Sequence, residues 1–184
     1  TMRCIGRIAF PVFAFLIAEG FIHTRSRYRY FFTLLGFAVI SEIPWYLLNG
    51  ADGTYNVMFT LALGLATLMV LENLLQRSLV LGFLWTLGMA GLASWLGVDY
   101  EWRGILIIVA SYLFNGYGHS FTYSRDMQFF CTFALVIHYG VIGAVMACMI
   151  LYVYNGTRGF VQGSIAKYGF YAFYPVHLLF ISMN

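Results

Sequence analysis

Residues 78–97, SLVLGFLWTLGMAGLASWLG, decide the fold class of this chain because they form an apolar run without a charged side chain. A helix rises about 1.5 Å per residue, so a run of this length crosses a hydrocarbon layer of about 30 Å. Apolar side chains occupy every face of such a helix, which is typical of a segment buried in lipid and among other helices. The stretch predicts a transmembrane helix.

Six further apolar runs accompany it, at 5–24, 29–49, 56–76, 103–118, 127–152 and 168–184. The chain is 61% hydrophobic and 9% charged, with a mean hydropathy of +0.80. It lacks the strand-like alternation with regular turns that is typical of a transmembrane barrel. We therefore expect an all-α, polytopic transmembrane helical bundle of about seven spans, forming a single membrane-embedded domain over residues 1–184.

The remaining composition predicts neither nucleic-acid binding nor a metal site. The net charge of +3 is spread thinly along the chain, without the basic patch of a nucleic-acid-binding protein. The three cysteines, Cys4, Cys131 and Cys148, show no metal-ligand spacing and no disulfide framework.

The basic residues between the spans predict the orientation. Those at positions 25, 27, 29, 77 and 125 fall on one side of a seven-span chain, and those at 103, 158 and 167 on the other. The positive-inside rule places the 25–29 loop in the cytoplasm. Arg158 and Lys167 argue against this choice, because the loop that carries them, 155–167, is then expected on the outer side, over the outer mouth of the bundle.

Polar residues inside the spans are the candidate site. An ionised group at the centre of a spanning helix costs roughly 2.5–3.5 kcal/mol on insertion scales, so it needs a partner, a cavity or a chemical role. With the orientation above, four such residues converge in the outer half of the membrane: Arg7, Glu42, Asn56 and His177. Tyr174 precedes His177 by three residues, so we expect their polar tips to share a helix face.

Each of these residues has a plainer interpretation. Arg7 suits an anionic group, but it also suits snorkelling to lipid headgroups. Glu42 precedes Pro44 and serves either in catalysis or in a structural pair with Arg7. His177 is either a general base or a histidine hydrogen-bonded between helices.

A second set of residues lies towards the predicted cytoplasmic side. Glu19 and His23 stand at i and i+4 on one helix face, where they would line a path from the cytoplasm. Arg25, Arg27 and Arg29 follow them, and these either bind the phosphates of a nucleotide-like cofactor or only set topology.

The chain resembles the TraX family, which is named for the acetyltransferase of conjugative pilin. The matching stretches, in family order, are Gly6–Phe13, Glu19–Arg25, Ile40–Pro44, Asn56–Thr60, Tyr154–Gly156 and Phe173–Leu178. The resemblance implies a multi-pass protein of the bacterial cytoplasmic (inner) membrane that transfers an acyl group from acetyl-CoA. It also implies a further span upstream with an Asp-His pair, which nothing before Gly6 supplies.

These observations lead to a specific hypothesis. His177, or the upstream histidine, acts as base, Glu42 orients it, and Arg7 or Asn56 stabilises the oxyanion. The cofactor-binding residues are then Arg25, Arg27, Arg29, His23 and Glu19, with Asn56 and Tyr174 at the acceptor. Beyond membrane lipids, the expected partner is an acyl acceptor: pilin, a peptide, a glycan or a lipid. The alternatives are a transporter or channel that uses the same buried charges, and a non-catalytic assembly factor.

Overall fold

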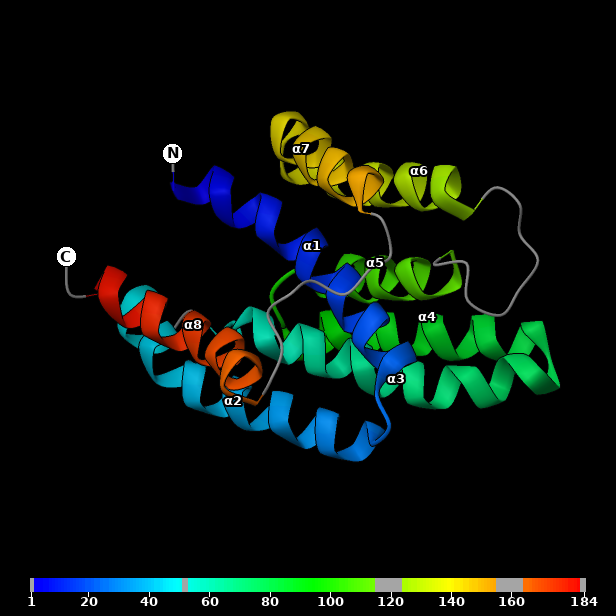
Figure 1. Cartoon of the computed structure of the whole chain (residues 1–184), viewed down its shortest axis with the longest axis horizontal. Coiled ribbons are helices and arrows are strands. Elements are labelled where there is room, and N and C mark those ends of the chain that lie inside the picture. The colour runs from blue at the N-terminus through cyan, green and yellow to red at the C-terminus, as the bar shows by residue number, and fades with distance from the viewer. Residues whose placement is uncertain (1, 51–52, 115–123, 155–163, 183–184) are drawn as a thin grey trace.

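The computed structural model describes residues 2–50, 53–114, 124–154 and 164–182, with the side chains of residues 2–8, 124–125, 139, 164–167, 170 and 182 left out. These residues form α-helices, one short 3-10 helix and no strand (Figure 1). The helices are α1 (Met2–His23), α2 (Arg27–Asn49), α3 (Val57–Arg77), α4 (Leu79–Leu96), α5 (Glu101–Leu113), α6 (Ser124–Val136), η1 (Ile137–Tyr139), α7 (Val141–Val153) and α8 (Ser164–Ser182). The predicted all-α membrane bundle is confirmed.

Three of the described helices are long and apolar enough to cross a membrane: α2, α3 and α4. Only Ser78 separates α3 from α4, so the two helices form a tight antiparallel pair. Shorter apolar stretches occur in α1, α6, α7 and α8. The helices therefore differ in how much of a bilayer each can span.

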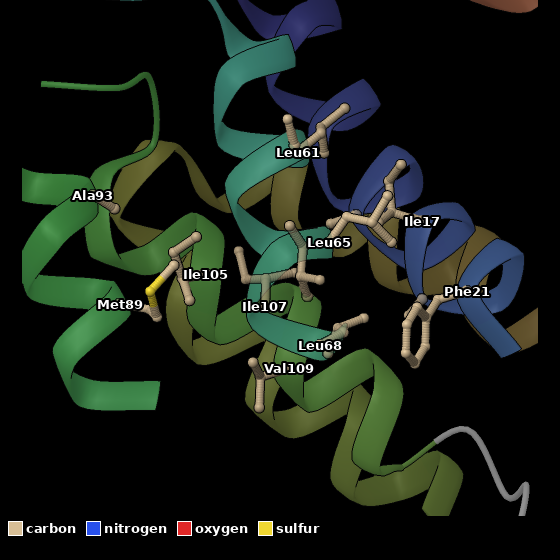
Figure 2. Close-up of a cluster of buried hydrophobic side chains, with 14 of the residues drawn as sticks. Ile17, Phe21, Leu61, Leu65, Leu68, Met89, Ala93, Ile105, Ile107 and Val109 are labelled. Carbon is tan, nitrogen blue, oxygen red and sulfur yellow. The ribbon is translucent and has the colours of Figure 1, made fainter. Parts of the chain in front are cut away.

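Helix α3 is the centre of the bundle and packs on α1, α2, α4 and α5. Its residues Leu65 and Leu68 are fully buried. Figure 2 shows the side chains that meet there from α1, α3, α4 and α5, among them Ile17, Phe21, Leu61, Leu65, Met89, Ile105 and Ile107. Gly64 allows α5 to approach closely, because an added Cβ would lie 2.2 Å from Ile108 Cδ1.

The expectation of one span over 127–152 is wrong. The structure divides this run into α6 and α7, which pack against each other as a helical hairpin (Figure 1). The break falls at Gly140, whose φ of 140° and ψ of 130° belong to a region that L side chains rarely adopt. The apolar run does not reveal the break, because both arms of the hairpin are as apolar as one span would be.

The hairpin reverses the side on which the next linker begins. Helix α7 ends at Val153, and the hydroxyl of the next residue, Tyr154, donates to Glu19 Oε1 at 3.4 Å, near the end of α1. Tyr171, in the first half of α8, stacks on Phe37 of α2 at 5.4 Å between ring centroids. Linker residues 155–163 lie outside the described part, but the chain enters them on the side of the α1–α2 junction, opposite to the expected outer mouth.

We call this side the Arg25 end, after the residue in the α1–α2 junction, and the opposite side the Glu42 end. Helix α5 ends and α6 begins at the Arg25 end, whereas α2 and α4 finish, and α3 and α5 begin, at the Glu42 end. The expected fifth span, 103–118, is helical only to Leu113, and residues 115–118 lie outside the described ranges.

Candidate active site

A polar cluster surrounds the first turn of α3, and Asn56 is at its centre. Asn56 is fully buried and is the N-cap residue of α3, where its Oδ1 accepts from the Met58 backbone N–H at 3.0 Å. Its Nδ2 donates to Glu42 Oε2 at 2.6 Å and to the Ala38 carbonyl at 2.9 Å. Asn56 therefore joins the start of α3 to the second half of α2.

Glu42 contacts the same helix end through a second bond. The backbone N–H of Asn56 donates to Glu42 Oε2 at 3.4 Å. The first amides of a helix lack intrahelical acceptors and carry a partial positive charge, so this is a favourable place for a carboxylate. Both bonds that the described residues give to Glu42 reach the same oxygen, Oε2.

Tyr174 reaches the cluster from α8. Its hydroxyl lies beside the backbone N–H of Val57, the next amide of α3, and near Glu42 and Asp99. Tyr171, one turn earlier, has its hydroxyl beside that of Tyr30 of α2. These two tyrosines seat α8 along α2, with which it runs parallel, and bring the Tyr174 hydroxyl to the start of α3.

The α4–α5 corner supplies residues that sequence reasoning missed. The backbone N–H of Tyr55 donates to the Gly97 carbonyl at 3.1 Å, and the backbone N–H of Asp99 donates to the Tyr55 carbonyl at 3.0 Å. The Thr60 hydroxyl donates to the Asp99 carbonyl. These bonds join two corners that are about forty residues apart in sequence, so no local pattern signals them.

Tyr100 completes this corner and connects it to α1. Its ring stacks on Phe10 with centroids 3.7 Å apart and an interplanar angle of 9°. Tyr100 and the following Glu101 have φ of 63° and 44°, values that are uncommon for residues with a side chain. The packing of Phe10 on Tyr100 places α1 beside the cluster, one turn from Arg7. The side chain of Arg7 itself is outside the described residues.

His177 does not join the cluster. Helix α8 buries Pro175 and Leu178, whereas His177 is exposed and stacks on Phe173, with the two rings 5.7 Å apart. The expectation that Tyr174 and His177 share a face is wrong, because Tyr174 turns inward while His177 turns outward. The structure brings together Glu42, Asn56 and Tyr174 of the residues singled out from sequence.

The three arginines of the α1–α2 junction have different surroundings. Arg27 forms a bidentate pair with Glu72 of α3, with Nη2 to Oε1 at 2.8 Å, and its guanidinium lies over the Phe21 ring. Arg25 and Arg29 are exposed. Glu72 was not anticipated, since its partner lies 45 positions away. Arg27 is thus engaged in holding α2 to α3.

Glu19 and His23 lie close together near the same end. His23 Nδ1 is 3.0 Å from the Glu19 carbonyl and 3.6 Å from its Oε1, and Glu19 also accepts from Tyr154. A shallow apolar pocket of about 300 Å³ runs beside them between α1 and α7. Its lining residues are Val12, Phe15, Leu16, Ile150, Leu151, Val153 and Tyr154.

The fold and the cluster define a class: a polytopic α-helical membrane protein with polar side chains gathered at one end of its bundle. The family model described as TraX protein matches residues 1–183, so the chain belongs to the TraX family. A similar protein is the probable fimbrial assembly protein FimC, serogroup H1, of Dichelobacter nodosus. It is 30% identical over 200 residues, which cover 96% of this chain and 80% of that protein. No solved structure matches the chain.

Proposed function

We propose that this protein is an integral membrane acyltransferase that moves an acetyl group from acetyl-CoA to an amine or hydroxyl acceptor, in the bacterial cytoplasmic membrane. The observation that supports it best is the cluster of Glu42, Asn56 and Tyr174, a carboxylate held against a helix start within a membrane bundle. Such groups are costly in a bilayer unless they are used. Membership of the TraX family agrees with a pilin-related acceptor.

Charge supports an orientation with the Arg25 end in the cytoplasm. The arginines at 25, 27, 29, 77 and 125 belong to junctions at this end. Because of the α6–α7 hairpin, α7 ends on this side and α8 begins there, and Arg158 and Lys167 follow α7 in the sequence. The two residues that argued against the positive-inside rule in a seven-span chain now agree with it. A cytosolic acyl donor therefore approaches the Arg25 end.

The donor's phosphates are bound by Arg25 and Arg29, both of which are exposed, with Glu19 and His23 beside them. Arg27 keeps the junction in place through its pair with Glu72. Glu42 is fifteen residues beyond Arg27 along α2, or about 22 Å of helix. The acyl group must therefore travel from one end of the bundle to the other on an extended arm.

At the Glu42 end, the acceptor attacks the thioester carbonyl carbon while its proton passes to the Glu42 carboxylate. The carbon–sulfur bond then breaks, and CoA leaves as a thiol that takes this proton from Glu42. Asn56 is a positioning residue, because both of the bonds that its amide donates are directed to Ala38 and Glu42. We assign Tyr174, whose hydroxyl lies beside the start of α3, the role of hydrogen-bond donor to the reacting groups. Arg7 supplies positive charge to the oxyanion from α1. His177 faces outward, so Glu42 replaces it as the proposed base.

The test is transfer of radiolabelled acetyl from acetyl-CoA by the purified protein, with free amino-terminal peptides and hydroxyl compounds as acceptors. We expect Glu42→Gln to reduce transfer at least a hundredfold while the protein remains folded. Glu101→Gln, at an exposed carboxylate near the same end, is the matched control and should retain activity. Equal rates for the Glu42→Gln and Glu101→Gln proteins would overturn the proposal.

A second candidate function is a non-catalytic role in pilus or fimbria assembly, which the name of the Dichelobacter nodosus relative favours. In that case the cluster is a structural cap on α3. Wild-type protein that is folded yet transfers no acetyl group to any acceptor, while its loss still abolishes surface fimbriae, would support this function instead.

A further inference from the structure

The pocket between α1 and α7, which we call the α1–α7 groove, has a volume of about 300 Å³ and apolar walls. Val12, Phe15 and Leu16 of α1 form one wall, and the last turn of α7 with Tyr154 forms the other. Leu16 is 44% exposed, so the groove opens to the outside of the bundle. Because the chain is a membrane bundle, an open apolar groove on its outer surface faces lipid chains.

One face of α1 leads from this groove to polar side chains. Val12, Leu16, Glu19 and His23 follow one another at i, i+4, i+7 and i+11, so they lie along a single helix face. This face is opposite to the one that α1 buries in the core. Glu19 is four residues before the end of α1, or about 6 Å. The face is therefore apolar beside the groove and polar where the helix reaches the Arg25 end.

The polar end of the groove is held in place by Tyr154. Its ring packs edge-on against Phe15, with centroids 5.1 Å apart, and its hydroxyl donates to Glu19 Oε1 at 3.4 Å. His23 Nδ1 lies 3.6 Å from the same oxygen. The Glu19 side chain is only 12% exposed, and a carboxylate covered to this extent is favourable only beside donors or a cation. The groove thus ends at a positioned carboxylate.

The headgroup must decide which lipid stays in the groove. Lipid chains are as apolar as the groove walls, so packing alone barely distinguishes the groove from the surrounding bilayer. A carboxylate can accept about four hydrogen bonds, so Glu19 can accept from a ligand in addition to Tyr154. An ammonium group gives charge-assisted bonds, roughly twice as strong as neutral ones. A phosphoglycerol headgroup lacks the cation, and a quaternary amine lacks the N–H donors.

We propose that the α1–α7 groove binds an acyl chain of a phospholipid whose headgroup carries a primary amine, with the ammonium group at Glu19. Its volume accommodates about ten groups of the size of a water molecule, each about 30 Å³, which corresponds to a stretch of about ten methylenes. The site lies apart from the polar cluster around Asn56 and does not depend on acyl transfer. A carboxylate repels the phosphates of an acyl donor, so Glu19 is better matched to the lipid amine.

Photocrosslinking in phosphatidylcholine vesicles tests the site. The vesicles contain a small fraction of a phospholipid with a diazirine in its acyl chain, and three such probes differ only in their headgroup: ethanolamine, choline or glycerol. Mass spectrometry gives the labelling of residues 150–154 relative to that of Leu84, which is 57% exposed on α4 and represents an ordinary lipid-facing surface. We expect this ratio to be roughly three- to fivefold higher for the ethanolamine probe. Equal ratios for the three probes, or a higher ratio for choline or glycerol, would overturn the proposal.

Two variants separate the headgroup contact from the chain contact. Glu19→Gln keeps the shape and removes the charge, so the ratio for the ethanolamine probe should fall to that of the choline probe. Leu16→Trp fills the groove with an indole ring and should at least halve the labelling of residues 150–154, whereas Leu84→Trp on α4 is the matched control and should leave it unchanged. An undiminished ratio in Glu19→Gln, or undiminished labelling in Leu16→Trp, contradicts the site. The assay contains no acetyl-CoA, so its result is independent of whether the protein transfers acetyl groups.

Discussion

Replacing Asn56 by alanine should destabilise the protein more than any other single polar substitution in α3. The change removes the N-cap bond to Met58, which contributes about 1 kcal/mol. It also removes the donor to the Glu42 carboxylate, a charge-assisted bond of about 1.5–3 kcal/mol. Partial relaxation and water entry offset some of this loss, so we expect a decrease in the free energy of unfolding of about 3 kcal/mol.

The assay is reversible unfolding in mixed micelles, followed by the loss of helical circular dichroism as the fraction of denaturing detergent increases. Asn73→Ala is the matched control on the same helix. Asn73 is exposed, and its amide makes only a long 3.5 Å bond to the Met69 carbonyl, so this change should cost less than about 0.5 kcal/mol.

A double-mutant cycle separates the Glu42 contact from the cap. If Asn56 acts through Glu42, the substitutions Asn56→Ala and Glu42→Gln should be non-additive by about 1 kcal/mol or more. A loss below 1 kcal/mol for Asn56→Ala, or additivity of the two changes, would refute the assignment of Asn56 as the residue that holds Glu42 in place.

Three further predictions concern other parts of the bundle. Arg27 and Glu72 should show a coupling of about 1 kcal/mol in a double-mutant cycle of unfolding, a modest value because both side chains are partly exposed. Arg25→Ala and Arg29→Ala should leave stability unchanged and weaken acetyl-CoA binding. Equal effects of all three arginines on binding would contradict this division. Gly140→Ala should lower the free energy of unfolding by more than 1 kcal/mol because φ is 140° there, while Gly88→Ala, where an added Cβ meets nothing within 4 Å, should be neutral or stabilising in the same unfolding assay. His177→Ala should leave the Tm unchanged and the rate of acetyl transfer within about twofold of the wild type, since the side chain is exposed on α8. A large loss of transfer would restore the histidine as the base.

Sequence reasoning predicted most of the helices because each depends on a local property. A run without charges, such as that of α4, has few alternatives to a membrane helix. The α6–α7 break was missed because a single glycine in an apolar run has many possible conformations, and only packing of the two arms against each other selects the turn. That one break also changed the predicted side of the following linker.

The candidate site was predictable only in part, namely where a local property of the sequence was sufficient. Glu42 and Asn56 are conspicuous because a bilayer penalises them, and the sequence alone indicated that they have a role. Their partners were not predictable in this way. Tyr174 turns inward and His177 outward although they are three residues apart, because α8 packs on α2 through Tyr171 and so fixes which face is buried.

Composition and the length of its apolar runs thus determined by themselves that this protein is a helical membrane bundle, because lipid requires every backbone group in it to be bonded within a helix. Only the tertiary structure decided that the start of α3 gathers Glu42, Asn56, Tyr174 and the Asp99 corner, that Arg27 is paired with Glu72, and that α6 and α7 form a hairpin. These contacts join residues far apart in the chain, and they depend on which helix faces pack together rather than on any local pattern.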